Sequence, residues 1–368
     1  MRRRVVAPCA EQITPEVAVA TKVGINGLGR IGSLVLRAGL DYPDLQFVAV
    51  NDLTDPKTLA YLFEFNSVHG AFEGTVEVQN SSLVVDGEQI QVFHEKDPSK
   101  IPWRDAGIEI VIESTGVFEN LQAASKHLQA GARKVIITAP AKDVPTVLVM
   151  GVNQQAYHPA TDNVVAMGSC TTYALSAVVK VLNDKFGIKR GMVNTTHAYT
   201  NTQPLLDKPM ETLRRSRAAG INIVPTTTGA VRAVGKVIPE IDGKIDGIAV
   251  RVPVPDGSLI DLTCVLDREV TVDEVNKAFD EAAQSEELSP YLAAIDTPVV
   301  STDIIGVDQS SVVDKTLTMV NGDLVKVFSW YDNEWSFALR VCDVTSYLAD
   351  SLPAPVAHAR SGSRQTKP

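Results

Sequence analysis

The chain has 368 residues, of which 45% are hydrophobic and 21% are charged, and its formal net charge is −10 at pH 7. This length and composition indicate a folded protein with room for two domains. The acidic charge argues against nucleic acid as the main partner, and no apolar run is long enough to span a membrane, so we expect no membrane partner.

The cysteines are scattered along the chain without the spacing of a metal site or a disulfide framework; they are Cys9, Cys170, Cys264 and Cys342. This usage is typical of a reducing compartment, so we expect a cytoplasmic protein and no bound metal.

Both ends of the chain differ in composition from the rest. In residues 1–20, three arginines and a mildly apolar stretch follow Met1, and Glu11 and Glu16 argue against a secretory signal. We interpret them as an N-terminal extension, with a short organelle-targeting segment as the alternative. Residues 351–368 are rich in Pro, Ala, Ser, Arg and Lys, which predicts a flexible tail.

The first predicted element is an apolar strand at 22–26, which leads into Gly27-x-Gly29-x-x-Gly32 and a helix at 33–40. A second strand at 47–50 ends close to Asp52, at the distance that the dinucleotide-binding fingerprint requires. Gly27 allows the tight turn, Gly29 lets the backbone approach a pyrophosphate, and Gly32 lets the helix pack on the strand. The helix start binds the phosphates, and the Asp52 carboxylate accepts hydrogen bonds from the ribose hydroxyls. The pattern therefore predicts a Rossmann domain that binds NAD.

Alternating strands and helices are predicted up to residue 169, where we place the end of a domain that begins at residue 21. A buried strand at 108–112 is followed by residues 113–116, a helix at 121–130 ends before Gly131, and a strand follows at 134–138. Ligands bind at the carboxyl ends of such strands, which makes Ser114 and Thr115 candidates for the cofactor pocket.

The strongest chemical signal is Cys170, which stands in Gly-Ser-Cys-Thr-Thr just before an apolar helical stretch at 174–182. His197 follows in Thr-Thr-His-Ala-Tyr-Thr. A helix start and a nearby imidazole both favour the thiolate, so we expect a lowered pKa for Cys170 and a nucleophile with His197 as its proton acceptor.

Beyond Cys170 the pattern changes to longer alternating strands at 245–252 and 259–266, with shorter ones at 312–313 and 326–330. An amphipathic helix at 272–283 has Thr271 as its expected cap. We therefore predict an α/β protein: a Rossmann domain at 21–169 and an α+β catalytic domain at 170–333 with a mostly antiparallel sheet. A final helix within 334–350 returns to the NAD domain.

With both motifs in place, residues 22–350 resemble the phosphorylating glyceraldehyde-3-phosphate dehydrogenase family. The matching segments occur in the family's order, at 24–32, 51–55, 113–118, 169–172, 197–200, 213–219, 225–230, 251–253 and 330–334. The resemblance implies oxidation of D-glyceraldehyde 3-phosphate with NAD and inorganic phosphate, through a thiohemiacetal and a thioester on Cys170. It also implies a homotetramer, and NADP remains an alternative cofactor.

The resemblance assigns the remaining site residues. It implies that Thr200 and Arg251 bind the substrate phosphate. The residues implied for the attacking phosphate are Ser169, Thr171, Thr228, Gly229 and one arginine of Arg214, Arg215 and Arg217, for which we choose Arg215. Arg30 and Ile31 belong to the cofactor loop, and Asn333 holds the nicotinamide carboxamide.

Departures from the family pattern leave alternatives open. Tyr173 and Ala174 stand where the family usually has Asn and Cys, and Asp256 where it usually has Asn. One hypothesis is a specialised enzyme whose thiol tolerates oxidants or inhibitors; the other is that the Tyr173 phenol packs in the core. For the activity itself, erythrose-4-phosphate dehydrogenase and a regulatory protein with little turnover are the alternatives.

Overall fold

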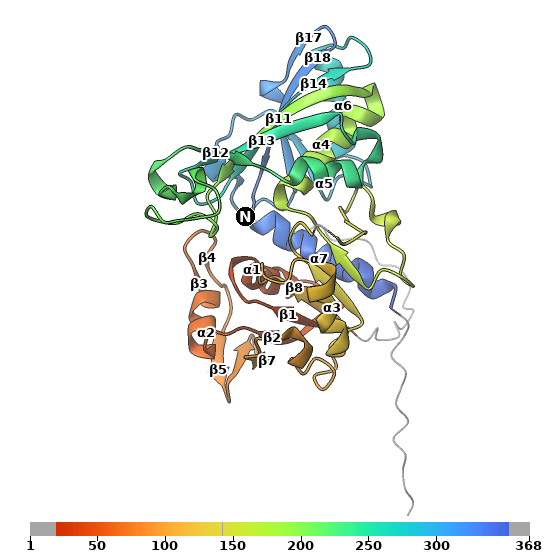
Figure 1. The fold of residues 1–368 in the computed structure, drawn as a ribbon. Coiled ribbons are helices and arrows are strands. Elements are labelled where there is room, and N and C mark those ends of the chain that lie inside the picture. Colours follow the sequence, from red (N-terminus) through yellow and green to blue (C-terminus); the bar gives the residue numbers. More distant parts are fainter. Residues whose placement is uncertain (1–19, 142, 353–368) are drawn as a thin grey trace, which may run out of the picture.

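A computed structural model describes residues 20–141 and 143–352. The predicted N-terminal extension and C-terminal tail lie almost wholly outside these residues. The described chain forms two lobes, each built on an eight-stranded sheet, with one long helix at their junction (Figure 1). Within the described residues, no helix is both long and apolar enough to cross a membrane.

The first lobe is an α/β sheet with strand order β10-β9-β8-β1-β2-β7-β6-β5. The pairs from β10 to β7 are parallel. Its strands and helices are β1 (Thr21–Asn26), α1 (Arg30–Gly39), β2 (Leu45–Asn51), α2 (Pro56–Glu64), β7 (Glu88–Phe93), β8 (Ile110–Glu113), α3 (Leu121–Gln129), β9 (Lys134–Ile137) and β10 (Val164–Ala166). Strands β8 and β9 are buried at every position, as expected for a parallel sheet covered on both faces.

One part of this lobe departs from the predicted alternation of strands and helices. Here β5 (Val76–Gln79) and β6 (Ser82–Val85) extend the sheet by antiparallel pairing with β7. The two hairpin turns contain Asn80-Ser81 and Asp86-Gly87, all with positive φ, which suits the twist of the flanking strands. A further small ribbon joins β3 (Phe65–Asn66) to β4 (Gly70–Ala71).

The second lobe is a mixed sheet with strand order β12-β13-β11-β14-β18-β16-β15, and β17 pairs with β18. Only the β11–β13 and β15–β16 pairs are parallel, so the predicted mostly antiparallel sheet is confirmed. Its elements are α4 (Cys170–Phe186), β11 (Ile188–Ala198), β12 (Val224–Thr227), α5 (Ala230–Val237), β13 (Ile245–Val252), β14 (Ser258–Leu266), α6 (Val272–Ala283), β15 (Leu292–Ile295), β16 (Ser311–Asp314), β17 (Met319–Asn321) and β18 (Leu324–Tyr331).

Helix α7 (Trp335–Asp350) follows β18 and lies between the lobes (Figure 1). On the first lobe, Tyr42 donates a hydrogen bond to Asp343 Oδ1 (2.6 Å), and Ser346 donates to Asp44 Oδ2 (2.6 Å). Buried side chains of α1 and α7 belong to one continuous core. This packing holds α7 on the first lobe, and the ion pair between Arg30 and Glu334 holds its start, and with it Asn333, beside the glycine loop.

Candidate active site

Cys170 and His197 come together from two elements of the second lobe. Cys170 is the first residue of α4, and Ser169 caps the helix: its Oγ accepts the Thr172 N–H (3.2 Å), while Thr172 Oγ1 accepts the Ser169 N–H (3.1 Å). His197 lies at the end of β11. The distance from Cys170 Sγ to His197 Nε2 is 3.5 Å, so one proton can pass directly between them.

The expected lowering of the Cys170 pKa is wrong. Burial raises the pKa of this thiol to about 11, although the charge of Arg251 and hydrogen bonds from Thr171 act in the opposite direction. Burial, together with the charge of Arg251, lowers the pKa of His197 to about 3. The pair therefore rests as a neutral thiol beside a neutral imidazole, because desolvation disfavours each charged form more than the helix start favours the thiolate.

Two groups hold the far side of the His197 ring. His197 Nδ1 lies 2.7 Å from the Ala198 carbonyl, and a proton on Nδ1 donated to this oxygen leaves Nε2 free to face the thiol. Arg251 Nη1 lies 3.0 Å from the same Nδ1 and donates to Ala198 O (2.9 Å). Arg251 is thus next to His197, and its charge also acts on Cys170.

The Thr171 side chain does not lie where we expected it, as a contact for phosphate. Its side chain is buried, and its hydroxyl shares a hydrogen bond with Tyr331 Oη (2.9 Å), which also contacts Thr195 Oγ1 (2.8 Å). The Tyr331 ring packs edge-on against His197, with 5.9 Å between ring centroids. Sequence reasoning gave Tyr331 no role, because nothing in the pattern showed that three distant segments meet at its hydroxyl.

The other residues expected to bind phosphate are Arg215, Thr228, Gly229 and Thr200. Of the three arginines, Arg215 is the half-buried one: its Nε donates to Thr226 Oγ1 (2.8 Å), and its charge acts on His197. Arg217 is instead paired with Asp207 (2.9 Å). Thr228 and Gly229 directly precede α5, and Gly229 is exposed. Thr200 lies two residues after the end of β11, and its hydroxyl shares a hydrogen bond with the Thr202 hydroxyl (2.9 Å).

The glycine loop has the geometry that the fingerprint requires. Gly27 has φ +93°, and a Cβ on Gly32 would lie 2.0 Å from Gly27 O, so neither position accepts a side chain. A Cβ on Gly29 would meet no atom within 4 Å. Gly29 therefore keeps an open side at the start of α1, where a dinucleotide phosphate fits. Arg30 and Ile31 follow as the first residues of α1, both half-buried.

Asp52 closes this loop from the end of β2. Its Oδ2 accepts the Leu28 N–H (2.8 Å) and its Oδ1 accepts the Thr54 N–H (2.9 Å). Ser114 Oγ donates to Gly27 O (2.6 Å) on the opposite side. Thr115 N donates to the buried Glu113 Oε1 (2.9 Å), a support that sequence reasoning did not identify.

Asn333 lies between the two lobes, two residues before the start of α7. Its Oδ1 accepts a hydrogen bond from Ser258 Oγ (2.6 Å), which orients Nδ2 as the remaining donor of the amide. Ser258 Oγ also accepts the Ala198 N–H (3.1 Å). A single hydroxyl therefore connects Asn333 to the strand that carries His197.

Tyr173 points away from the thiol and into the core. Its side chain is 2% exposed, its hydroxyl donates to Leu148 O (2.7 Å), and its ring packs edge-on against Phe337. This placement removes the geometric basis for a phenol that narrows the space beside Cys170. It agrees with the alternative in which Tyr173 is a packing residue.

Comparison with known proteins agrees with this geometry. Residues 21–121 match the model of the glyceraldehyde 3-phosphate dehydrogenase NAD binding domain, and residues 169–333 match that of the C-terminal domain. The chain is 51% identical to "Glyceraldehyde-3-phosphate dehydrogenase" of Geobacillus stearothermophilus over 332 residues, which cover 90% of this chain and 99% of the relative. Proteins of the same name are 52% identical in Thermotoga maritima over 89% of this chain and 98% of the relative, and 48% identical in Streptomyces coelicolor over 90% and 99%. The chain belongs to the glyceraldehyde-3-phosphate dehydrogenase family.

Proposed function

We propose that the chain oxidises D-glyceraldehyde 3-phosphate with NAD and inorganic phosphate to 1,3-bisphosphoglycerate. The observation that carries this proposal is the 3.5 Å contact between Cys170 Sγ and His197 Nε2 at the start of α4, with Arg251 beside the imidazole. A thiol, a proton acceptor and a phosphate-binding cation are the groups that this reaction needs.

The first lobe fits NAD. The open side of Gly29 leaves room for the pyrophosphate at the start of α1, and the Asp52 carboxylate lies where ribose hydroxyls would donate to it. When bound, NAD supplies the acceptor for the hydride. Asn333 is the residue we assign to orienting its carboxamide, because its Nδ2 remains as a donor.

Cys170 and His197 would then carry out two chemical stages. Sγ adds to the aldehyde carbon as its proton passes to Nε2, and Nε2 returns this proton to the new alkoxide to give a thiohemiacetal. His197 removes that hydroxyl proton as hydride leaves for the nicotinamide, which gives a thioester on Cys170. We assign the Cys170 backbone N–H, at the start of α4, to the developing oxyanion.

Phosphate completes the turnover. A phosphate oxygen attacks the thioester carbonyl, the thiolate leaves, and the acyl phosphate is released. We assign Arg215, Thr228 and Gly229 to this phosphate, because a half-buried guanidinium and the start of α5 both favour an anion. Ser169 is available only in part, since its hydroxyl already caps α4.

We also propose a homotetramer in the cytoplasm. The face of the second sheet that carries Met192 and Ile248 leaves these side chains 68% and 50% exposed, and Leu205 and Leu213 on the long loop after β11 are 82% and 88% exposed. Apolar surfaces of this kind indicate protein contacts.

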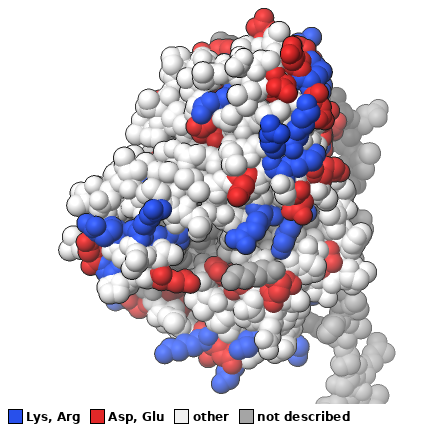
Figure 2. Space-filling view, turned by 45° about the horizontal axis from the view of Figure 1, so that its top comes forward, with Lys and Arg blue, Asp and Glu red and all other residues white. Residues whose placement is uncertain are grey.

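On the face in Figure 2, basic and acidic side chains lie interspersed.

The test is an assay of NAD reduction with purified protein. We expect reduction with glyceraldehyde 3-phosphate that depends on inorganic phosphate, with a much lower kcat/KM for erythrose 4-phosphate. The reverse preference would assign the chain to the four-carbon aldehyde, and no reduction with either aldehyde would favour a regulatory protein. Light scattering coupled to size-exclusion chromatography measures the oligomeric state.

A further inference from the structure

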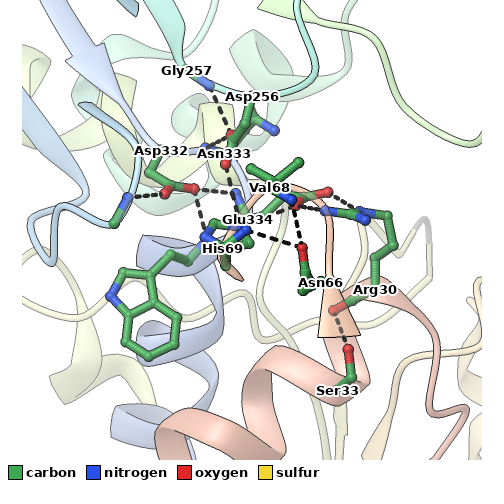
Figure 3. A network of polar contacts seen from close by, with 12 residues as sticks. Arg30, Ser33, Asn66, Val68, His69, Asp256, Gly257, Asp332, Asn333 and Glu334 are labelled. Carbon is green, nitrogen blue, oxygen red and sulfur yellow. Dashed lines mark hydrogen bonds and ion pairs between the residues drawn. The ribbon is translucent and has the colours of Figure 1, made fainter. Parts of the chain in front are cut away.

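A cluster of ionisable side chains lies where the lobes meet, beside Asn333 and the start of α1 (Figure 3). His69 comes from the segment between β3 and β4, Asp256 from the turn between β13 and β14, and Glu334 from the residue before α7. His69 Nε2 lies 3.4 Å from Asp256 Oδ2 and 3.2 Å from Glu334 Oε2. None of these three residues has a role in the chemistry described above.

Asp256 is the most buried member, with 1% of its surface exposed. Its Oδ1 accepts the Gly257 N–H (2.8 Å) and the Asn333 N–H (3.2 Å), so this carboxyl group directly positions the backbone of Asn333. Its Oδ2 makes no hydrogen bond among the described residues, and His69 Nε2, 3.4 Å away, is shared with Glu334. A buried carboxylate oxygen without a hydrogen bond is costly, so the ionised form of Asp256 is disfavoured here.

The charges around Asp256 do not balance. Asp332 and Glu334 face it from the β18–α7 junction, His69 from the β3–β4 segment and Arg30 from α1, while its charge also reaches Cys170. Arg30 donates through Nε and Nη2 to the two oxygens of Glu334. Three carboxyl groups therefore share one imidazole and one guanidinium, and both of these groups also contact Glu334.

We propose that Asp256 is a positioning residue that carries a proton, and that loss of this proton at alkaline pH disturbs Asn333 and weakens NAD binding. This inference rests on the proposed function, because it assumes that Asn333 holds NAD. A neutral carboxyl group keeps Oδ1 as the acceptor for Asn333 and adds no charge near the cofactor phosphates.

The direction of the effect follows from the environment. Burial, then the charge of Asp332 and a hydrogen bond with it, raise the pKa of Asp256 to about 8. The proton is therefore present at neutral pH and is lost as the pH rises through this value. The ionised carboxylate would compete with the cofactor phosphates for Arg30, and repel them.

A divalent cation is the competing occupant. The three ligand atoms all lie within 4.8 Å of one another, which is close enough for a metal ion. However, Arg30 binds both oxygens of Glu334 and would repel a second cation. A proton satisfies Asp256 Oδ2 without that repulsion, so we favour the proton.

The experiment measures the Kd of NAD for the full-length protein without aldehyde, by quenching of tryptophan fluorescence, from pH 7 to pH 9 in the presence of EDTA. We expect the wild-type affinity to fall about tenfold over this range, because only the protonated fraction binds NAD well. Asp256→Asn should abolish this pH dependence, since an amide oxygen still accepts both N–H groups. Asp246→Asn is the matched control: Asp246 Oδ1 also accepts the following glycine N–H (2.7 Å), but the residue is exposed and far from the cluster, so the fall should persist.

Equal pH dependence in Asp256→Asn and the wild type would overturn the inference. So would a wild-type affinity that drops with EDTA and recovers with Zn²⁺, because the positive charge would then be a metal ion. Failure of the proposed function looks different: aldehyde-dependent NAD reduction would be absent at pH 7, whatever the binding profile.

Discussion

His197 and Arg251 are direct neighbours on the parallel strands β11 and β13, and Arg251 Nη1 lies 3.0 Å from His197 Nδ1. The pairing puts a fixed positive charge on the side of the imidazole that faces away from Cys170. Burial, and after it this charge, lowers the pKa of His197 to about 3, so the ring is neutral at physiological pH. A neutral imidazole can accept the thiol proton, and the arginine remains available for a substrate phosphate.

Removing this imidazole should slow the chemistry without preventing binding. We expect His197→Asn to lower kcat by about 100-fold or more, the usual scale for a lost general base, while the Kd of NAD stays close to the wild-type value. His158→Asn, at an exposed histidine of the first lobe, is the control and should keep wild-type kcat. A kcat for His197→Asn within a factor of a few of the wild type would exclude the acid–base role.

Cofactor preference should depend on the charge of Asp52. Its carboxylate repels a 2′-phosphate, so we expect NAD to be preferred over NADP. Because Oδ2 also holds the Leu28 N–H, Asp52→Asn is a sharper test than alanine: the amide oxygen keeps this contact while the charge is lost. The ratio of kcat/KM for NADP to that for NAD should rise. An unchanged ratio in Asp52→Asn would contradict the ribose-binding role.

The second and third glycines of the loop should respond differently to alanine. Gly32→Ala places a methyl group against Gly27 O, so we expect it to lower the free energy of unfolding by about 1–3 kcal/mol. Gly29→Ala meets open space and should leave the melting temperature unchanged while it raises the Kd of NAD. Thermal unfolding and NAD titration of both variants separate these effects; a Gly29→Ala variant that binds NAD normally would place the phosphates elsewhere.

Tyr173 should matter for stability and not for the reactivity of the thiol. Tyr173→Phe leaves the Leu148 carbonyl without its donor, which should cost about 1–3 kcal/mol of unfolding free energy. The rate of inactivation by peroxide should be the same in Tyr173→Phe and the wild type. If the variant is inactivated several times faster at equal stability, Tyr173 does protect Cys170, and the specialised-enzyme hypothesis returns.

The fold was largely predictable because its signals are local. The Gly27-x-Gly29-x-x-Gly32 turn, the apolar strands on either side and the capped helix after Thr271 each depend on neighbouring residues, and all are present. The hairpins that join β5, β6 and β7 were missed, although Asp86-Gly87 between β6 and β7 is a strong turn signal. The prediction for that segment followed the alternation of strands and helices and did not use this turn signal.

The chemistry of the site was only partly predictable. Spacing indicated that Cys170 and His197 belong together, but not how strongly the surrounding protein desolvates them, so the predicted direction of the thiol's pKa shift was wrong. The hydroxyl of Tyr331 and the carboxyl group of Asp256 act through contacts between segments far apart in sequence. Such contacts follow from tertiary packing, for which a single sequence carries no local signal.

The most direct measurement of the central claim is the turnover of Cys170→Ser, followed as NADH formed from glyceraldehyde 3-phosphate and inorganic phosphate. The account predicts no measurable turnover with NAD binding retained, because an alcohol does not supply an accessible anion. Cys342→Ser is the matched control. Cys342 is buried and donates to Val35 O, and a serine hydroxyl can donate to the same oxygen, so we expect this variant to keep its turnover. Wild-type turnover in Cys170→Ser would contradict the assignment of Cys170 as the nucleophile.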